Sequence, residues 1–129
     1  MNPANAIARH RLTRARTALD EANALIAKNH FLGALNRVYY AAFYAARATL
    51  ATMAVDSSRH SGVIALFQQH FVRTDRIPAE IAKALPRAFE KRQTSDYGDF
   101  SEPTHDEVIP LRDQVEAFIA ACEHIVSTM

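Results

Sequence analysis

Apolar residues recur at helical spacing from one end of this chain to the other. In the first segment they alternate four and three apart, on one seam of a helix from about Asn5 to Lys28: Ala8, Leu12, Ala15, Leu19, Ala22 and Ile26. A similar face runs from Val108 to Ile125, after a capping box of Thr104 and Glu107. The pattern therefore predicts a long helix near each end of the chain.

The segment from about Phe31 to Met53 is apolar nearly all round, which is typical of a helix at the centre of a bundle. One side of it is rich in alanine, so another helix can approach closely: Ala41, Ala42, Ala45, Ala46 and Ala48. We expect this second helix to be the central one.

The middle of the chain predicts shorter helices. The turn 56–58 can cap a helix that holds Val63 and Phe67. A fourth helix begins at Pro78, and Pro86 inside it predicts a kink or break near Ala84. Since no alternating strand pattern occurs, we expect an all-α fold, a four- to five-helix up-down bundle forming a single domain over residues 1–129.

Composition narrows the class of protein. The hydrophobic fraction of 49% fits a globular chain, and no apolar run is long enough to span a membrane. The first residues lack the pattern of a signal peptide, so we expect a cytoplasmic protein. The lone Cys122 lies in a helical apolar pattern, which favours a buried structural thiol over a nucleophile.

The net charge is only +1, but the charges are unevenly distributed. Residues 1–98 hold fourteen Lys and Arg against seven Asp and Glu, whereas residues 99–129 hold one Arg against seven acids. Either packed helices match their charges internally, or a basic surface binds phosphate while the acidic last helix serves a partner. The sequence leaves both interpretations open.

A stripe of arginine and tyrosine lies along the predicted central helix. Spacings of three, four and three residues put Arg37, Tyr40, Tyr44 and Arg47 on one narrow face. In a structural interpretation the tyrosines pack in the core and the arginines pair with acids of the fourth or fifth helix. In a functional one the stripe is a groove where arginine binds phosphate and tyrosine stacks on a base.

Two further groups of polar residues are candidates for chemistry. Arg92 and Asp96 are four apart at the end of the fourth helix and are followed by Tyr97, while Lys91 ends a four-spaced basic row that is either a solvated face or a binding surface. His60 opens the third helix, where it either packs locally or adds a donor or proton shuttle. With no phosphate-binding glycine loop and no zinc spacing, we expect no metal and no cofactor.

Three motifs in order resemble the HEPN superfamily, and most closely its small, uncharacterised prokaryotic members. They span most of the chain, from about residue 8 to 125: Asn36-Arg37-x-Tyr39-Tyr40-Ala41-Ala42-Phe43, then His60-Ser61-Gly62, then Arg92-x-x-x-Asp96-Tyr97. The resemblance implies an all-α bundle that forms a homodimer. Such proteins are often encoded beside a minimal nucleotidyltransferase, in toxin-antitoxin or nucleotide-handling pairs.

Many HEPN proteins are metal-independent ribonucleases with an Arg-x4-6-His signature, which this chain lacks, because Asp96 and Tyr97 stand where the histidine is expected. The departure favours a protein that binds RNA or nucleotide beside a nucleotidyltransferase. A ribonuclease and a non-catalytic helical interaction module remain the alternatives. The resemblance implies catalytic roles for Arg92, Asp96 and Tyr97, and the candidate RNA- or nucleotide-binding residues are Arg37, Tyr40, Tyr44, Arg47, His60 and Lys91.

Overall fold

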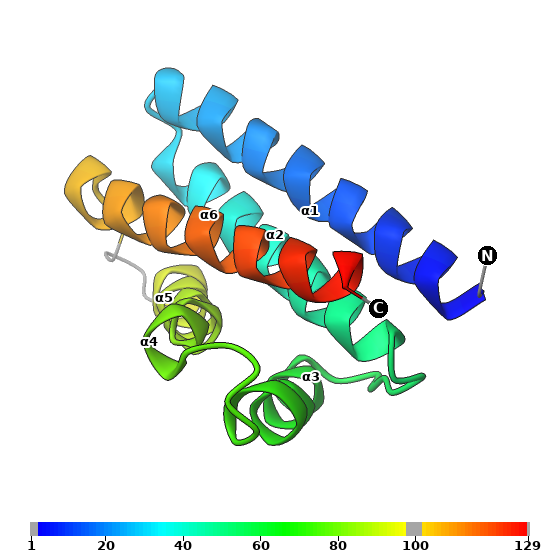
Figure 1. The fold of residues 1–129 in the computed structure, drawn as a ribbon. Helices are drawn as coiled ribbons and strands as arrows, with labels where there is room; N and C mark the ends of the chain where they lie inside the picture. The colour runs from blue at the N-terminus through cyan, green and yellow to red at the C-terminus, as the bar shows by residue number, and fades with distance from the viewer. Residues whose placement is uncertain (1–2, 98–101, 129) are drawn as a thin grey trace.

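The computed structural model describes residues 3–97 and 102–128, without the side chains of Asp96 and Tyr97. Every regular element within these ranges is helical, as predicted. The elements are α1 (Pro3–Ala27), α2 (Phe31–Ala51), α3 (His60–Phe67), a π-helical turn η1 (Gln68–Val72), α4 (Ala79–Ala82), α5 (Ala84–Tyr97) and α6 (His105–Ser127). The long helices α1, α2 and α6 pack against one another, and α3 and α5 lie across one side of them (Figure 1).

The first two helices form an antiparallel pair joined by a tight turn (Figure 1). Asn29 stops α1 because it adopts a left-handed backbone with φ of 61°, a conformation that asparagine tolerates better than most residues. The N–H of His30 then donates to the carbonyl of Leu25 at 2.9 Å, which satisfies one of the last carbonyls of the helix. The short connection keeps α1 beside α2 along their length.

Helix α2 is the central helix, as its apolar circumference predicts. It packs against α1, α3, α5 and α6. The alanines predicted to admit close neighbours have no exposed surface: Ala41, Ala42, Ala45, Ala46 and Ala48. The small alanine side chains let neighbouring helices approach α2 closely, and the larger side chains of α2 can contact several helices at once.

The fourth predicted helix is divided, also as expected. Helix α4 ends at Ala82 and α5 begins at Ala84, so Pro86 lies in the first turn of α5, where its missing N–H breaks no helical hydrogen bond. The predicted side-chain cap within 56–58 is wrong, because Arg59 is the N-cap of α3 and makes no side-chain cap bond. Ser57 instead accepts the N–H of Arg59 at 3.2 Å, within the turn itself.

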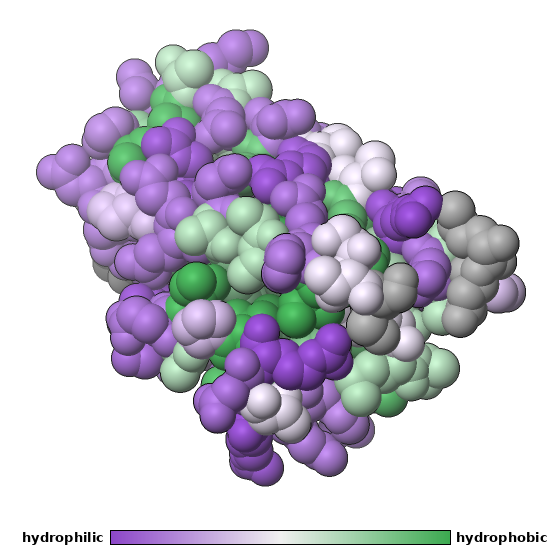
Figure 2. Space-filling view, viewed as in Figure 1, coloured by the Kyte–Doolittle hydropathy of each residue, from purple (hydrophilic) through white to green (hydrophobic). Residues whose placement is uncertain are grey.

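Helix α6 begins with the predicted capping box at Thr104 and Glu107 and buries the predicted apolar face, including the fully buried Cys122. Figure 2 shows a largely polar surface over α1 and α6, with apolar side chains visible between α6 and α3. Among the described helices, none has the length and apolar character needed to cross a membrane.

Candidate functional site

Two consecutive tyrosines of α2 form the centre of the candidate site. They point about 100° apart around the helix, so Tyr39 is fully buried and reaches Phe89 of α5 while Tyr40 is half-buried at the edge of the core. The guanidinium carbon of Arg92, on α5, lies 5.0 Å from the ring centre of Tyr39 and 5.1 Å from that of Tyr40. Both distances are those of cation–π contacts.

Arg37, which lies on α2 like Tyr40, also contacts the Tyr40 ring. Its guanidinium carbon lies 5.0 Å from the ring centre of Tyr40. Two arginines that are far apart in the sequence therefore meet on one side chain. The carboxylate of Glu21 on α1 is 3.8 Å from the Arg37 guanidinium, a long ion pair between half-exposed groups.

His60, the first residue of α3, completes this group. Its Nδ1 lies 2.8 Å from the Tyr39 hydroxyl oxygen, and its ring is 4.4 Å from Phe43 and 5.9 Å from Tyr40, centre to centre. We call the set Arg37, Tyr39, Tyr40, His60 and Arg92 the tyrosine cluster. It draws on α2, α3 and α5, so no local stretch of sequence contains it.

Burial sets the protonation of the two hydrogen-bonded members of the tyrosine cluster. Burial raises the pKa of Tyr39 far above its usual value, which the charge of Arg92 offsets only in part. Burial also lowers the pKa of His60 below 6.5, and the positive charges of Arg92 and Arg47 lower it further. At neutral pH the phenol therefore keeps its proton and the imidazole is uncharged.

The other end of the α2 stripe faces α1 and the loop before α3. Tyr44 accepts a hydrogen bond of 3.1 Å from Arg14 of α1, whose guanidinium lies 4.9 Å from the ring centre. Arg47 donates two hydrogen bonds to Asp56, at 3.1 and 2.7 Å. The hydrogen bond from Arg47 is the main cause that lowers the pKa of the Asp56 carboxyl.

The prediction that the stripe arginines pair with acids of the fourth or fifth helix is wrong for Arg37 and Arg47. The acids are Glu21 on α1 and Asp56 in the loop before α3, because the stripe faces α1 at one edge and the loop at its end.

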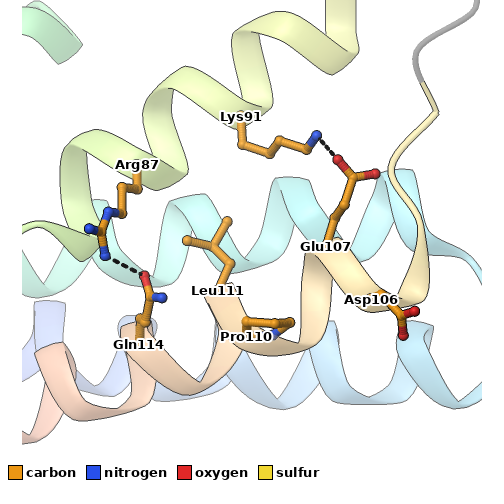
Figure 3. A pocket seen from close by; sticks show the side chains of 7 residues that line it. All are labelled: Arg87, Lys91, Asp106, Glu107, Pro110, Leu111 and Gln114. Carbon is orange, nitrogen blue, oxygen red and sulfur yellow. Dashed lines mark hydrogen bonds and ion pairs between the residues drawn. The ribbon is translucent and has the colours of Figure 1, made fainter.

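Lys91 is not brought to the tyrosine cluster, although it precedes Arg92. Its ammonium pairs with Glu107, and the side chain lines a hollow of about 330 Å³ between α5 and α6 (Figure 3). Arg87 donates to Gln114 across the same hollow at 3.3 Å, and Lys83 pairs with Glu80. Each of these three basic side chains, Lys83 between α4 and α5 and Arg87 and Lys91 on α5, therefore contacts a neighbouring polar group.

The uneven charge of the sequence is partly matched between helices. Arg16 of α1 binds two carboxylates of α6, Glu116 at 2.7 Å and Glu123 at 2.5 Å, and both hydrogen bonds raise the pKa of Arg16. The basic body thus pairs with the acidic last helix along one side of α1. Arg14 lies on another side of α1, where it contacts Tyr44 of α2 next to the candidate site.

Two of the three predicted catalytic residues, Asp96 and Tyr97, end α5, but their side chains lie outside the described part of the structure. Tyr39 was not predicted as a member of the tyrosine cluster, nor were Phe43 and Arg14 predicted as neighbours of that cluster. A signal for Arg14 is present in the sequence, since a polar set on α1 is spaced four, three and four apart: His10, Arg14, Thr17 and Glu21.

Comparison with known proteins identifies the family. Over residues 8–125 the chain matches the HEPN domain. It belongs to the HEPN family. Every member of the tyrosine cluster lies within the matched range of this HEPN domain.

Named relatives of this HEPN domain occur in bacteria and archaea. A "UPF0332 protein" of Thermotoga maritima is 36% identical over 129 residues, which are 100% of this chain and 98% of that protein. "UPF0332 protein glr0978" of Gloeobacter violaceus is 40% identical over 87 residues, 67% of this chain and 69% of its own. "Putative toxin MJ0142" of Methanocaldococcus jannaschii is 30% identical over 86 residues, 67% of this chain and 58% of its own.

Proposed function

We propose that this HEPN domain is a toxin-type protein that binds RNA or nucleotide at the tyrosine cluster. One observation carries the proposal: Arg37 and Arg92 come from two helices and meet on the ring of Tyr40. Guanidinium groups bind phosphate oxygens through paired N–H donors, so two of them at one point suit a phosphate. The relative named as a toxin supports the biological role.

The two kinds of side chain have separate tasks in this proposal. Guanidinium groups of arginines already lie over the rings of Tyr40 and Tyr44. In our proposal these tyrosines therefore orient the arginines and do not stack on a base. The arginines bind phosphate, and a base can stack on their planar guanidinium groups, as bases do on arginine elsewhere. Asp96 and Tyr97 extend the site at the end of α5 in our proposal.

Membership of the HEPN family supports a proposal about partners. We propose that the chain forms a homodimer and works with a minimal nucleotidyltransferase, as one member of a toxin-antitoxin or nucleotide-handling pair. A basic site in the body and an acidic α6 give such a partner two distinct surfaces to recognise.

A second candidate function is metal-independent RNA cleavage, and the position of His60 favours it. His60 and Arg92 contact the same two tyrosine rings, although they come from α3 and α5. The Tyr39 hydroxyl can donate to Nδ1 or accept from it, so the imidazole can hold its proton on either nitrogen. His60 would move the proton and Arg92 would stabilise the phosphorane, in place of the usual Arg-x4-6-His pair.

Fluorescence anisotropy with a labelled single-stranded RNA dodecamer tests the binding proposal. Arg92→Gln should weaken binding about tenfold and lower the dependence of affinity on salt. Arg76→Gln is the matched control, because it removes the same charge from another cation–π contact, 4.8 Å from the ring centre of Phe71. Equal losses in the two variants would mean that only net charge matters.

Incubation of the same RNA with the protein in excess EDTA tests the second function. Cleavage that is lost in His60→Gln and in Arg92→Lys, while both variants still bind the dodecamer, supports a ribonuclease. An intact strand after incubation with the unaltered protein leaves binding as the function of the site.

A further inference from the structure

A second hollow lies on the α1 side of the stripe, apart from the contacts of Arg92. It has a volume of about 420 Å³ and lies between α1 and α2. Its lining is mostly polar: His10, Arg14, Thr17, Ala18, Glu21, Arg37 and Tyr44. The spacing of four, three and four residues along α1 aims the α1 members at the same side of that helix.

The chemistry of this hollow suits an anion. Arg14 and Arg37 supply two guanidiniums, and the His10 ring can add a hydrogen-bond donor. Tyr44 accepts its hydrogen bond from Arg14, so the Tyr44 hydroxyl proton can be donated to a further acceptor. Among the described residues that line the hollow, Glu21 is the only acid.

Arg37 joins this hollow to the tyrosine cluster. Its guanidinium lies over Tyr40, where Arg92 also lies, and its side chain lines the hollow. The rings of Tyr40 and Tyr44 are 6.0 Å apart, centre to centre, so one helical turn separates the two places. Cations therefore follow one another from Arg92 through Arg37 to Arg14 along the surface of α2.

We infer that the hollow between α1 and α2 binds a second phosphate of the same RNA strand. This inference rests on the proposed function and names its ligand class, a single-stranded oligonucleotide with at least two phosphates rather than a mononucleotide. The backbone of such a strand runs from the tyrosine cluster across Arg37 to Arg14. A line of spaced guanidiniums is the arrangement that follows a nucleic-acid backbone.

Glu21 holds Arg37 in the free protein and gives it up to phosphate. Its side chain is 54% exposed, and its carboxylate is 3.8 Å from the Arg37 guanidinium, so the pair is long and open to solvent. A bound phosphate would be repelled by Glu21 and attracted by Arg14. Removing the charge of Glu21 should therefore strengthen RNA binding, whereas removing the charge of Arg14 should weaken it.

The test measures binding of the labelled RNA dodecamer to Arg14→Gln, Glu21→Gln, Arg92→Gln and the unaltered protein at several salt concentrations. Arg14→Gln should weaken binding about fivefold and lower the salt slope by about 0.7, the share of one phosphate on a single strand. Glu21→Gln should tighten binding about twofold to threefold. Partial unfolding would not produce opposite effects from Arg14 and Glu21, which line the same hollow. Thermal melts of all four proteins monitor unfolding.

The outcomes separate this inference from the proposed function. If Arg92→Gln weakens binding but Arg14→Gln and Glu21→Gln leave it unchanged, the inference is overturned and the proposed site stands. If the strand responds to Arg14 and Glu21 but not to Arg92, the hollow is supported and the proposed site fails. If the dodecamer does not bind to the unaltered protein, both are overturned.

Discussion

Tyr40 positions two arginines that, in our proposal, bind the phosphate. Its ring lies between the fully buried core and solvent, and the guanidiniums of Arg37 and Arg92 both rest on it. A ring quadrupole attracts a cation without neutralising its charge, unlike a carboxylate. The ring therefore holds both guanidiniums at one point of the protein, whatever other polar partners they have.

Gly62 is the residue whose small size the loop before α3 requires. A Cβ built there would lie 2.1 Å from Oγ and 2.9 Å from Cβ of Ser57, distances that real contacts do not reach. Gly62→Ala should lower the free energy of unfolding by about 1–3 kcal/mol, because the loop must shift. Chemical denaturation measures the loss.

The control for Gly62 is Gly33→Ala, where the nearest atom is the flexible end of Leu25 at 3.3 Å and alanine favours the helix. That substitution should be neutral or stabilising. Adding Ser57→Gly to Gly62→Ala should recover part of the loss, and a double variant no more stable than Gly62→Ala would contradict the packing argument.

His60 should make stability depend on pH as the pH falls below the usual pKa of histidine, about 6.5. Its pKa in the folded protein lies below 6.5, so the unfolded chain takes up the proton first. The stability that His60 contributes is complete above pH 6.5 and is lost as the pH falls towards the lower folded pKa. The melting temperature of the unaltered protein should therefore approach that of His60→Gln as the pH falls, in a series of thermal melts.

Asp56 does not disturb this comparison, because its lowered pKa places its own effect below about pH 4, where the folded protein loses the stability of that carboxylate. A gap between the two melting temperatures that stays constant from pH 7 to pH 5 would show that His60 is not held in its uncharged form.

The positions of some residues of the site can be predicted from the sequence, and those of others cannot. The three-four-three spacing was enough to place Arg37, Tyr40 and Tyr44 on one face, since helical geometry is local. The contact of His60 with Tyr39 was not foreseeable, because it depends on where α3 docks on α2. Long-range packing of this kind leaves no spacing in the sequence.

At the scale of elements, α2 decides the arrangement of the bundle. The alanines at 41, 42, 45, 46 and 48 have no exposed surface, so the neighbouring helices approach as closely as a methyl group allows. Ala45→Leu should cost about 1–3 kcal/mol of unfolding free energy, because three extra carbon atoms have no space there. Denaturant titration measures it.

Ala65→Leu is the comparison for that substitution. Ala65 is exposed on α3, so the same change in size should alter stability by no more than about 0.5 kcal/mol. Similar losses at the two positions would mean that α2 is not tightly surrounded.

The helices themselves were largely predictable. The spans of α1 and α2 follow from local periodicity, and the break between α4 and α5 follows from Pro86. The cap of α3 was wrong because Ser57 bonds within its own turn, and several residues can serve equally well in a short polar turn. The acids that face the α2 stripe were also misassigned, since periodicity does not say which helix packs on which face.

At the scale of the whole molecule, charge is divided between two sides. Arg16 binds carboxylates of α6, whereas Arg14 and Arg37 line a hollow whose described residues include a single acid, Glu21. The division fits both interpretations of the uneven charge, since matching on one side of α1 leaves the opposite side basic. That remaining side is where we propose that RNA binds.

We expect the chain to form a homodimer, as its HEPN family membership implies. Light scattering coupled to size exclusion should give twice the chain mass at micromolar concentration. A mass equal to one chain across that range would contradict the expectation, and it would leave the tyrosine cluster to act within a monomer.

The central claim is that Arg37 and Arg92 act on one ligand through one ring. A double-mutant cycle of RNA affinity with Arg37→Gln, Arg92→Gln and the double variant tests it most directly, because residues that share a contact are not additive. The account predicts that the fold-loss of affinity in the double variant is smaller than the product of the two single fold-losses, by a factor of at least about three. A double loss equal to that product, or no loss in either single variant, would show that the two arginines do not form one binding site.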